Sequence, residues 1–227
     1  MNLIALETTT ELGSCALLAH GRLIERFCPP KQPHAESLLP LVREMMAEAG
    51  LAFGELDGIA FGCGPGAFTG LRVACGVAQG FAVAAGVPVT PVSSLEAMAF
   101  QVDAPHVLSL LDARMGEVYF GQVRRAGGGL HLLDGIRVGA PEAVSLPLEG
   151  EWVACGNAPT VYPVLAERLA QAGIVYREGV LPTASAVAQI AAARPEAAID
   201  AALAAPLYIR DKVAKTIAER LLEGGKA

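Results

Sequence analysis

Residues 62–72, with the sequence GCGPGAFTGLR, join a short apolar segment to a long run of small residues. Four of these eleven residues are glycines, which let two backbone segments approach more closely than side chains permit. The pattern predicts a buried strand in ELDGIAFG (55–62) and a helix that begins near Thr69 or Gly70. Such a strand-to-helix loop either binds an anion with backbone N–H groups or serves as a tight crossing of chain segments.

The two common phosphate-binding motifs fit this loop poorly. GCGPGA matches only the start of the dinucleotide fingerprint, Pro65 removes one N–H donor, and no acid ends the next predicted strand, VPVTPV (87–92). A P-loop is disfavoured because no Lys-Ser/Thr pair follows a G-x-x-x-x-G. The sequence therefore favours the architectural interpretation, in which Arg72 ties the loop to neighbouring carbonyl groups or to an acid.

The helix after the loop predicts a covering partner. In TGLRVACGVAQGFAVAAG (69–86), apolar and small residues surround nearly the whole circumference, and Gln79 is the main polar interruption. A helix that is apolar on every side must be covered on every side. The preceding helix, AESLLPLVREMMAEAG (35–50), carries two apolar stripes. Either both helices bind a second protein or they pack only on each other. The residues expected to bind a partner are Leu38, Leu39, Val42, Met45, Met46, Leu71, Val73, Val77 and Phe81.

The rest of the chain predicts strand hairpins that alternate with helices twice, which indicates a mixed-sheet α/β protein. We expect an opening hairpin (NLIAL and CALLAH), a helix capped by Ser93 or Ser94, and a turn at RRAGGG (124–129). Further strands are expected in HVLSLL, EVYFGQVR, GLHLLDG and EWVACG, and further helices over 163–172, 184–193 and 212–222. Pro105 marks a lobe boundary. The expected domains are residues 1–103 and residues 104–227, with the option that the last helix returns to the first lobe.

Composition excludes several classes of protein. With 17 Lys and Arg against 23 Asp and Glu, the formal charge is −6 and the basic residues are scattered, which disfavours strong nucleic-acid binding by this chain alone. The five cysteines form no C-x-x-C pair and are expected to be reduced, mostly buried thiols of a cytoplasmic protein. The N-terminus lacks the features of a signal sequence, and the segment 73–89 is shorter than a bilayer span. No membrane association is expected.

Candidate catalytic and metal-binding residues are few. Two histidines four residues apart on a helix can coordinate one metal ion, but the residue four positions after His34 is Leu38. The chain also contains no H-E-x-x-H motif. No metal site is therefore expected. Asp112 and Arg114 end a predicted strand and form either a cleft acid or, as we favour, an ion pair that fixes a turn. The stretch CGNAP (155–159) is interpreted as a turn, and Cys155 as a buried thiol.

Several motifs together resemble the TsaB (YeaZ) family of tRNA threonylcarbamoyladenosine biosynthesis. GPGAFTGLR (64–72) is similar to its signature G-P-G-S-F-T-G-L-R, whose matching residues here are Gly64, Pro65, Gly66, Thr69, Gly70 and Arg72. The segments LETTTELGSCAL (6–17), HAESLLP (34–40), DARMGEVYF (112–120) and PLYIR (206–210) resemble further family motifs in the same order. The resemblance implies a two-lobed actin-like ATPase, or ribonuclease H-like, fold with a reduced second lobe.

The resemblance also implies a function. TsaB proteins are understood as non-catalytic subunits that pair through first-lobe helices with the catalytic subunit TsaD, joined by the ATPase TsaE. That assembly transfers threonylcarbamoyl to the adenosine beside the anticodon of tRNA. The resemblance further implies that this chain alone binds no cofactor and that the complex uses ATP and Mg²⁺. It also implies that the chain reaches tRNA indirectly and that a homodimer can form without the partner.

Two positions depart from the family pattern. Glu7 stands where the family usually carries Asp, and Ala67 where it carries Ser. Both changes weaken an anion or metal role for the loop. The alternative is an enzyme, a small phosphotransferase with ATP across the loop 64–70 and Glu7 near its metal. Phosphoryl transfer needs positioned Mg²⁺ and a carboxylate, and the second lobe offers only Asp112 at a strand end.

Overall fold

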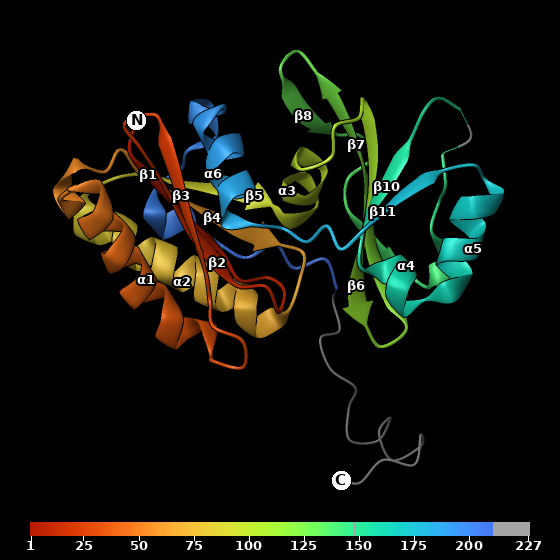
Figure 1. The fold of residues 1–227 in the computed structure, drawn as a ribbon, viewed down its shortest axis with the longest axis horizontal. Helices are drawn as coiled ribbons and strands as arrows, with labels where there is room; N and C mark the ends of the chain where they lie inside the picture. Colours follow the sequence, from red (N-terminus) through yellow and green to blue (C-terminus); the bar gives the residue numbers. More distant parts are fainter. Residues whose placement is uncertain (148, 211–227) are drawn as a thin grey trace, which may run out of the picture.

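A computed structural model describes residues 1–147 and 149–210 and contains two mixed β-sheets (Figure 1). The first sheet has the order β3-β2-β1-β4-β5. Strands β1, β2 and β3 are antiparallel, whereas β4 and β5 run parallel to β1. The bounds are Leu3–Glu7 for β1, Ser14–Ala19 for β2, Arg22–Phe27 for β3, Gly58–Gly64 for β4 and Val89–Ser93 for β5.

The second sheet has the order β11-β10-β6-β7-β8, and β9 also pairs with β7. Its centre is the antiparallel hairpin of β6 and β7, which ends in a turn at residues 114–117. The bounds are His106–Arg114 for β6, Glu117–Ala126 for β7, Gly129–Leu132 for β8, Arg137–Gly139 for β9, Val153–Gly156 for β10 and Val175–Glu178 for β11.

The helices form three layers around the two sheets (Figure 1). One layer, α1 and α2, packs on the outer face of the first sheet; α3 and α6 lie between the sheets; α4 and α5 cover the far face of the second sheet. The bounds are His34–Ala49 for α1, Phe68–Ala85 for α2, Ser94–Phe100 for α3, Ala158–Val161 for α4, Pro163–Gln171 for α5 and Ala184–Ala192 for α6. Short 3₁₀ turns span Phe53–Glu55, Pro141–Ala143, Pro195–Ala197 and Ala201–Leu203.

Strand β1 is the centre of the first sheet and is buried on both faces. Ile4 and Leu6 belong to the core beneath α1 and α2, whereas Leu3 and Ala5 belong to the core that contains α3 and α6. Successive side chains of a strand point to opposite faces, so a strand covered on both sides has no polar alternation. This position explains the uninterrupted apolar run of the sequence and places Glu7, two residues after Ala5, at the buried end of the strand.

Most of the predicted elements are confirmed, and the mixed α/β class with two sheets is confirmed as well. Ser93 caps α3, since its hydroxyl accepts the N–H of Leu95. The turn after β7 uses positive φ angles at Gly127 and Gly128, whereas the same expectation for Gly129 is wrong. The sequence interpretation missed the short elements β3, β9, β11 and α4.

The expected division after residue 103 falls between α3 and β6, in the segment that connects the two sheets. After the second sheet the chain returns to the first sheet, where α6 packs against β1, β2 and β4. The final helix expected over residues 212–222 lies outside the described residues. The assignment of domains stays a prediction.

Within the described part of the chain, α2 is the one helix long and apolar enough to cross a membrane by length and composition. Its buried residues, among them Ala74, Ala78 and Ala82, pack in the core of the first lobe. A core helix passes the same test of length and composition, so the packing accounts for the apolar character of this side of α2.

Candidate functional site

The glycine-rich loop between β4 and α2 is held against the turn that follows β1. The N–H of Ala67 donates to the carbonyl oxygen of Thr9 at 2.7 Å. The hydroxyl of Thr8 donates to the carbonyl oxygen of Gly70 at 2.7 Å. Thr9 is fixed in turn, because its hydroxyl lies 3.0 Å from the hydroxyl of Ser94. The first turn of α2 is therefore locked to the end of the central strand.

This contact requires glycine at two positions of the loop. A methyl group on Gly70 would lie 1.8 Å from the carbonyl oxygen of Thr8, and one on Gly66 would lie 2.4 Å from that of Thr9. Both distances are far below van der Waals contact, so no other residue fits without movement of the backbone. Gly64 has a φ of +121°, a conformation that residues with a side chain rarely adopt. The predicted tight crossing of strand, loop and helix is confirmed.

Arg72 holds a different partner from the one expected. The prediction of a carbonyl or acidic partner is wrong for the described residues, since the Nε–H of Arg72 donates to the hydroxyl of Tyr208 at 3.1 Å. Its guanidinium also lies 3.9 Å from the centre of the Phe68 ring, and that ring contacts the ring of Tyr208. Arg72 thus connects α2 to a segment near residue 208.

Glu7 is buried completely at the end of β1. Its Oε1 accepts the N–H of Thr9 at 2.6 Å. Its Oε2 has no hydrogen-bond partner among the described residues and faces Gly62, where a methyl group would lie 1.9 Å away. Burial raises the pKa of Glu7 from 4.5 to about 7, against the smaller opposing effect of the Thr9 hydrogen bonds. Glu7 is not among the residues that line the cavity between the lobes, so its carboxyl group belongs to the core in this structure.

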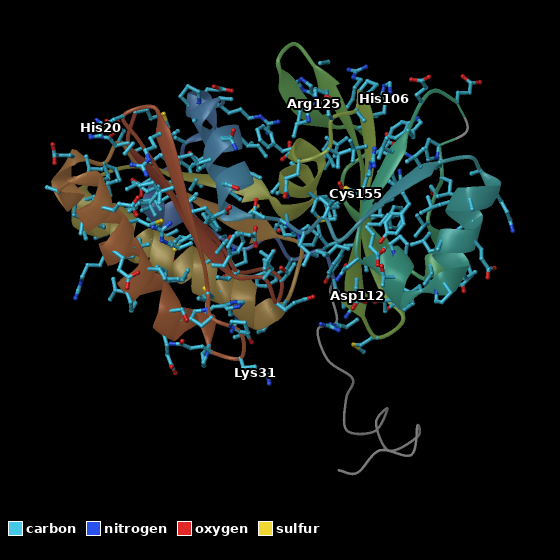
Figure 2. All side chains as sticks on the ribbon, viewed as in Figure 1. His20, Lys31, His106, Asp112, Arg125 and Cys155 are labelled. Carbon is cyan, nitrogen blue, oxygen red and sulfur yellow. The ribbon has the colours of Figure 1, made fainter. Side chains whose placement is uncertain are left out.

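Asp112 lies at the end of β6 opposite His106 (Figure 2). Its Oδ1 accepts the hydroxyl of Tyr162 at 2.8 Å and the N–H of Arg114 at 2.9 Å, and its Oδ2 lies 3.4 Å from the Arg114 guanidinium. Only 3% of the Asp112 side chain is exposed. Asn157, in the predicted turn, accepts the backbone N–H of Asp112 at 2.9 Å. The favoured interpretation, an Asp-Arg pair that fixes a turn, is confirmed.

A cavity of about 440 Å³ lies between the lobes and is lined by the turn after β1, the glycine-rich loop and the end of β6. The acids on its lining are Glu11, exposed in the turn, and Asp112, which is engaged in the ion pair. No group of three or more potential metal ligands occurs in the residues that the structure describes. Among the described residues, the cavity therefore offers a magnesium ion one ion-paired carboxylate, Asp112, and one exposed carboxylate, Glu11.

The structure separates the nine residues expected at the partner surface into two groups. Five of them are buried in the chain's own core and cannot meet a partner that docks on the existing surface: Leu38, Val42, Met45, Met46 and Leu71. The first sheet covers the four residues of α1, and Leu71 lies against Gly64 of the loop, so the placement of these five residues on the surface is wrong. Leu39 is 52% exposed, and Val73, Val77 and Phe81 are half-buried. These four residues stay predicted contacts.

The sequence interpretation missed two of the most exposed apolar side chains. Val83 of α2 is 74% exposed and Leu203 is 70% exposed. Gln79, one helical turn before Val83, brings Leu203 to α2, because its side-chain amide donates to the carbonyl oxygens of Ala201 and Ala204 at 3.1 Å. Val83 and Leu203 are more than a hundred positions apart, so no local sequence pattern indicates that they lie near the same helix.

The cysteines behave as expected from their spacing. All five are free; Cys15, Cys63, Cys75 and Cys155 are buried, and Cys28 is half-buried. Burial raises the pKa of Cys155 to about 12, so that its thiol stays protonated and unreactive at neutral pH.

The fold and the site together define a two-lobed α/β protein whose glycine-rich loop is structural and whose candidate acids are engaged in the fold. Residues 30–218 match the family model described as TsaD, tRNA N6-adenosine threonylcarbamoyltransferase. The chain is 35% identical over 228 residues to the tRNA threonylcarbamoyladenosine biosynthesis protein TsaB of Escherichia coli (strain K12), covering 94% of this chain and 96% of the relative. It is 45% identical over 129 residues to TsaB of Haemophilus influenzae, covering 55% of each chain.

Solved structures agree with this assignment. YeaZ from Pseudomonas aeruginosa superposes with a TM-score of 0.82 and 39% identity, covering 91% of this chain and 99% of that one. A P. aeruginosa protein described as similar to peptidase YeaZ gives a TM-score of 0.84 and 37% identity, covering 92% and 99%. The chain belongs to the TsaB (YeaZ) family.

Replacement of Gly70 by Ala should destabilise the protein strongly, whereas replacement of Gly76 by Ala in the same helix should not. The methyl group of Gly70→Ala would strike the Thr8 carbonyl, an overpacking that costs about 3 kcal/mol. Apart from the helix's own backbone, no atom of the described residues lies within 4 Å of a methyl group on Gly76, so Gly76→Ala should stabilise α2 by about 1 kcal/mol. Urea unfolding measures both; equal stabilities would contradict the described crossing.

Stability should fall as the pH rises through the range in which Glu7 titrates. The folded state keeps a proton that the unfolded state releases above its pKa of 4.5, so stability is greatest below that pH and is lost up to about pH 7. The loss attributable to Glu7 is about 3 kcal/mol. Glu7→Gln should remove this part of the pH dependence in urea unfolding, whereas the exposed control Glu36→Gln should keep it. The same slope in wild type and Glu7→Gln would refute the burial of an ionisable Glu7.

Proposed function

We propose that the chain is a non-catalytic scaffold and activator that pairs with a TsaD-like catalytic subunit. Together with a TsaE-like ATPase, the pair would transfer threonylcarbamoyl from its adenylate to the adenosine next to the anticodon of tRNA, with AMP as the leaving group. The names of the relatives, which belong to tRNA threonylcarbamoyladenosine biosynthesis, support this pathway. The engagement of Glu7 and Asp112 in the fold supports a role without chemistry of its own.

The observation that carries the proposal is the outward row of α2. Arg72, Gly76, Gly80 and Ala84 follow one another at four-residue spacing and are all exposed, with Val83 beside them. Residues four apart lie on one helix face, so Gly76, Gly80 and Ala84 form a continuous strip without large side chains, and Arg72 stands at its N-terminal end. A second helix can approach such a strip closely, and Val83, Val77 and Leu39 supply apolar area around it.

The match to the TsaD family model supports a partner of similar shape. Since residues 30–218 match that model, a TsaD-like subunit would carry helices that correspond to α1 and α2. Two related subunits can then meet through equivalent faces, as in a pseudo-twofold dimer. We expect two copies of this chain to pair through the same face when the partner is absent.

The charge of the chain supports a division of labour within the complex. With a formal charge of −6, the chain would contact tRNA only indirectly, and its partners would provide the basic surface. ATP and Mg²⁺ would be used by the complex and not bound by this chain alone. A cytoplasmic location follows from the proposed work on tRNA.

The alternative, a phosphotransferase, is tested by calorimetry. Titration of Mg²⁺-ATP into the isolated chain should give no binding in the sub-micromolar range, because the acids of the cleft are engaged or exposed in a turn. Tight binding that is lost in Asp112→Asn would overturn the scaffold proposal and make the cleft a catalytic site.

The scaffold proposal is tested by one charge placed on the α2 face. Val83→Glu would bury a carboxylate in the interface and should weaken pairing with a TsaD-like subunit at least about a hundredfold, as loss of an interface hot spot does. The matched control is Val175→Glu, which alters an exposed valine of β11 in the second sheet. Analytical ultracentrifugation measures pairing, and circular dichroism checks the fold.

Activity should follow pairing in a reconstituted system. Threonylcarbamoyl transfer to tRNA by TsaD-like and TsaE-like proteins should require this chain, persist with the Val175→Glu control and fail with Val83→Glu. Glu7→Gln should retain activity, since Glu7 is a structural residue in this proposal. Transfer that is independent of the chain would refute the scaffold role.

A further inference from the structure

The segment Ala201–Arg210 runs from the side of α2 to the second lobe. Its first contacts are with the first lobe, where Gln79 binds the carbonyl oxygens of Ala201 and Ala204. The N–H of Leu207 then donates to the carbonyl oxygen of Cys63 at 2.7 Å, at the end of β4. The segment therefore lies along the glycine-rich loop as well as along α2.

The same segment ends on the turn between β6 and β7. The guanidinium of Arg210 donates to the carboxylate of Glu117 and to the carbonyl oxygen of Ala113, the latter at 3.1 Å. Only 14% of the Arg210 side chain is exposed. The turn that it holds is unusual, because Arg114 and Met115 both have positive φ angles, +62° and +54°. Residues with side chains rarely adopt this conformation without support from their surroundings.

Tyr208 connects the middle of the segment to α2. Its hydroxyl accepts the Nε–H of Arg72, and its ring lies 5.6 Å from the ring of Phe68 between centroids. Phe68 and Arg72 begin the row of residues at four-residue spacing that continues through the exposed face of α2. Tyr208 is itself 48% exposed, so it borders that face at its N-terminal end.

We propose that the segment Ala201–Arg210 is part of the surface that receives the TsaD-like subunit and that it transmits docking to the cleft between the lobes. This inference rests on the proposed function. The TsaD-like subunit, seated along α2, contacts Leu203 at one end of the face and Tyr208 at the other. Arg210 then carries any displacement or stiffening of the segment to the β6–β7 turn.

Three features of the segment support this path. Leu203 is among the most exposed large apolar residues of the described chain, and exposed apolar area next to a predicted interface gains from being covered. The ring of Tyr208 and the guanidinium of Arg72 have the composition of interface hot spots. The end of the path, Asp112–Arg114, lines the cavity between the lobes, so a change at the turn alters that cavity.

The contact surface is tested with Leu203→Ser. Loss of the exposed leucine should weaken the affinity for a purified TsaD-like subunit about tenfold, as truncation of an apolar interface contact does. The matched control Leu133→Ser alters an exposed leucine next to β8 and should leave the affinity unchanged. Equal affinities of Leu203→Ser and wild type, with Val83→Glu impaired, would overturn the inference and leave the proposed function standing.

The transmission is tested by hydrogen exchange with Tyr208→Phe, which removes only the hydroxyl bound by Arg72. In the wild type, addition of the TsaD-like subunit should slow amide exchange at residues 112–117 about fivefold, a change typical of one ordinary hydrogen bond. Tyr208→Phe should still bind the subunit but lose this slowing. The control Tyr176→Phe, which removes a hydroxyl within the second lobe, should retain it. Slowing that persists in Tyr208→Phe, or is absent in the wild type, would overturn the transmission.

A third measurement uses the free chain and does not depend on the partner. Arg210→Gln should raise amide exchange at residues 66–71 about fivefold, because the segment is released from the second lobe. Glu117→Gln, which weakens the same contact from the other side, should act in the same direction. Unchanged exchange in both variants would overturn the transmission. If the subunit binds neither wild type nor control, the proposed function fails instead, and with it the docking role of Leu203 and Tyr208.

Discussion

The contact that the rest of the structure depends on is the approach of the glycine-rich loop to the backbone of Thr8 and Thr9. Gly66 and Gly70 leave room for these carbonyl groups, and two hydrogen bonds close the contact. Because β1 is the central strand of the first sheet, this contact fixes the start of α2 relative to the core of the lobe. It therefore also sets the direction of the outward face of α2. One side of the glycine-rich loop thus packs on the protein's own main chain, and the loop also lines the cavity between the lobes.

The acids that could have served chemistry in the cleft are used for structure. Glu7 is withdrawn into the core, where burial raises its pKa to about 7. Asp112 is shared between Tyr162 and Arg114 and stabilises a turn that contains two residues with positive φ. Charges with fixed partners inside a protein are difficult to recruit for a substrate, because any new contact must replace an existing one. Of the two acids that line the cavity in the described part of the chain, Asp112 thus has fixed partners and Glu11 is exposed.

The sequence predicted those features of the fold and the site that depend on contacts between residues close together in the chain. The strands and long helices followed from apolar runs and from caps such as Ser93. The motif loop was interpreted correctly, but the sequence could not name Thr8 as its neighbour, 62 residues from Gly70. The apolar stripes of α1 indicated that Leu38 and Met45 would be covered, but not which element would cover them. In the structure the first sheet covers both residues. Tyr208 as the partner of Arg72, 136 positions away, had no local signal at all.

The glycines of α2 fall into two groups, those that the fold of the free chain requires and those that it does not. Gly70 cannot carry a side chain because the Thr8 carbonyl occupies the space, whereas nothing lies within 4 Å of a methyl group on Gly76 or Gly80. Glycine in an exposed helix interior costs about 1 kcal/mol relative to alanine, and the described residues offer no internal contact that offsets this at either position. In the proposed pairing, a partner helix seated on this row would offset it, because its backbone would occupy the space that side chains would otherwise fill. The packing of the free chain thus requires glycine at position 70, whereas the proposed docking face would be the reason for glycine at positions 76 and 80.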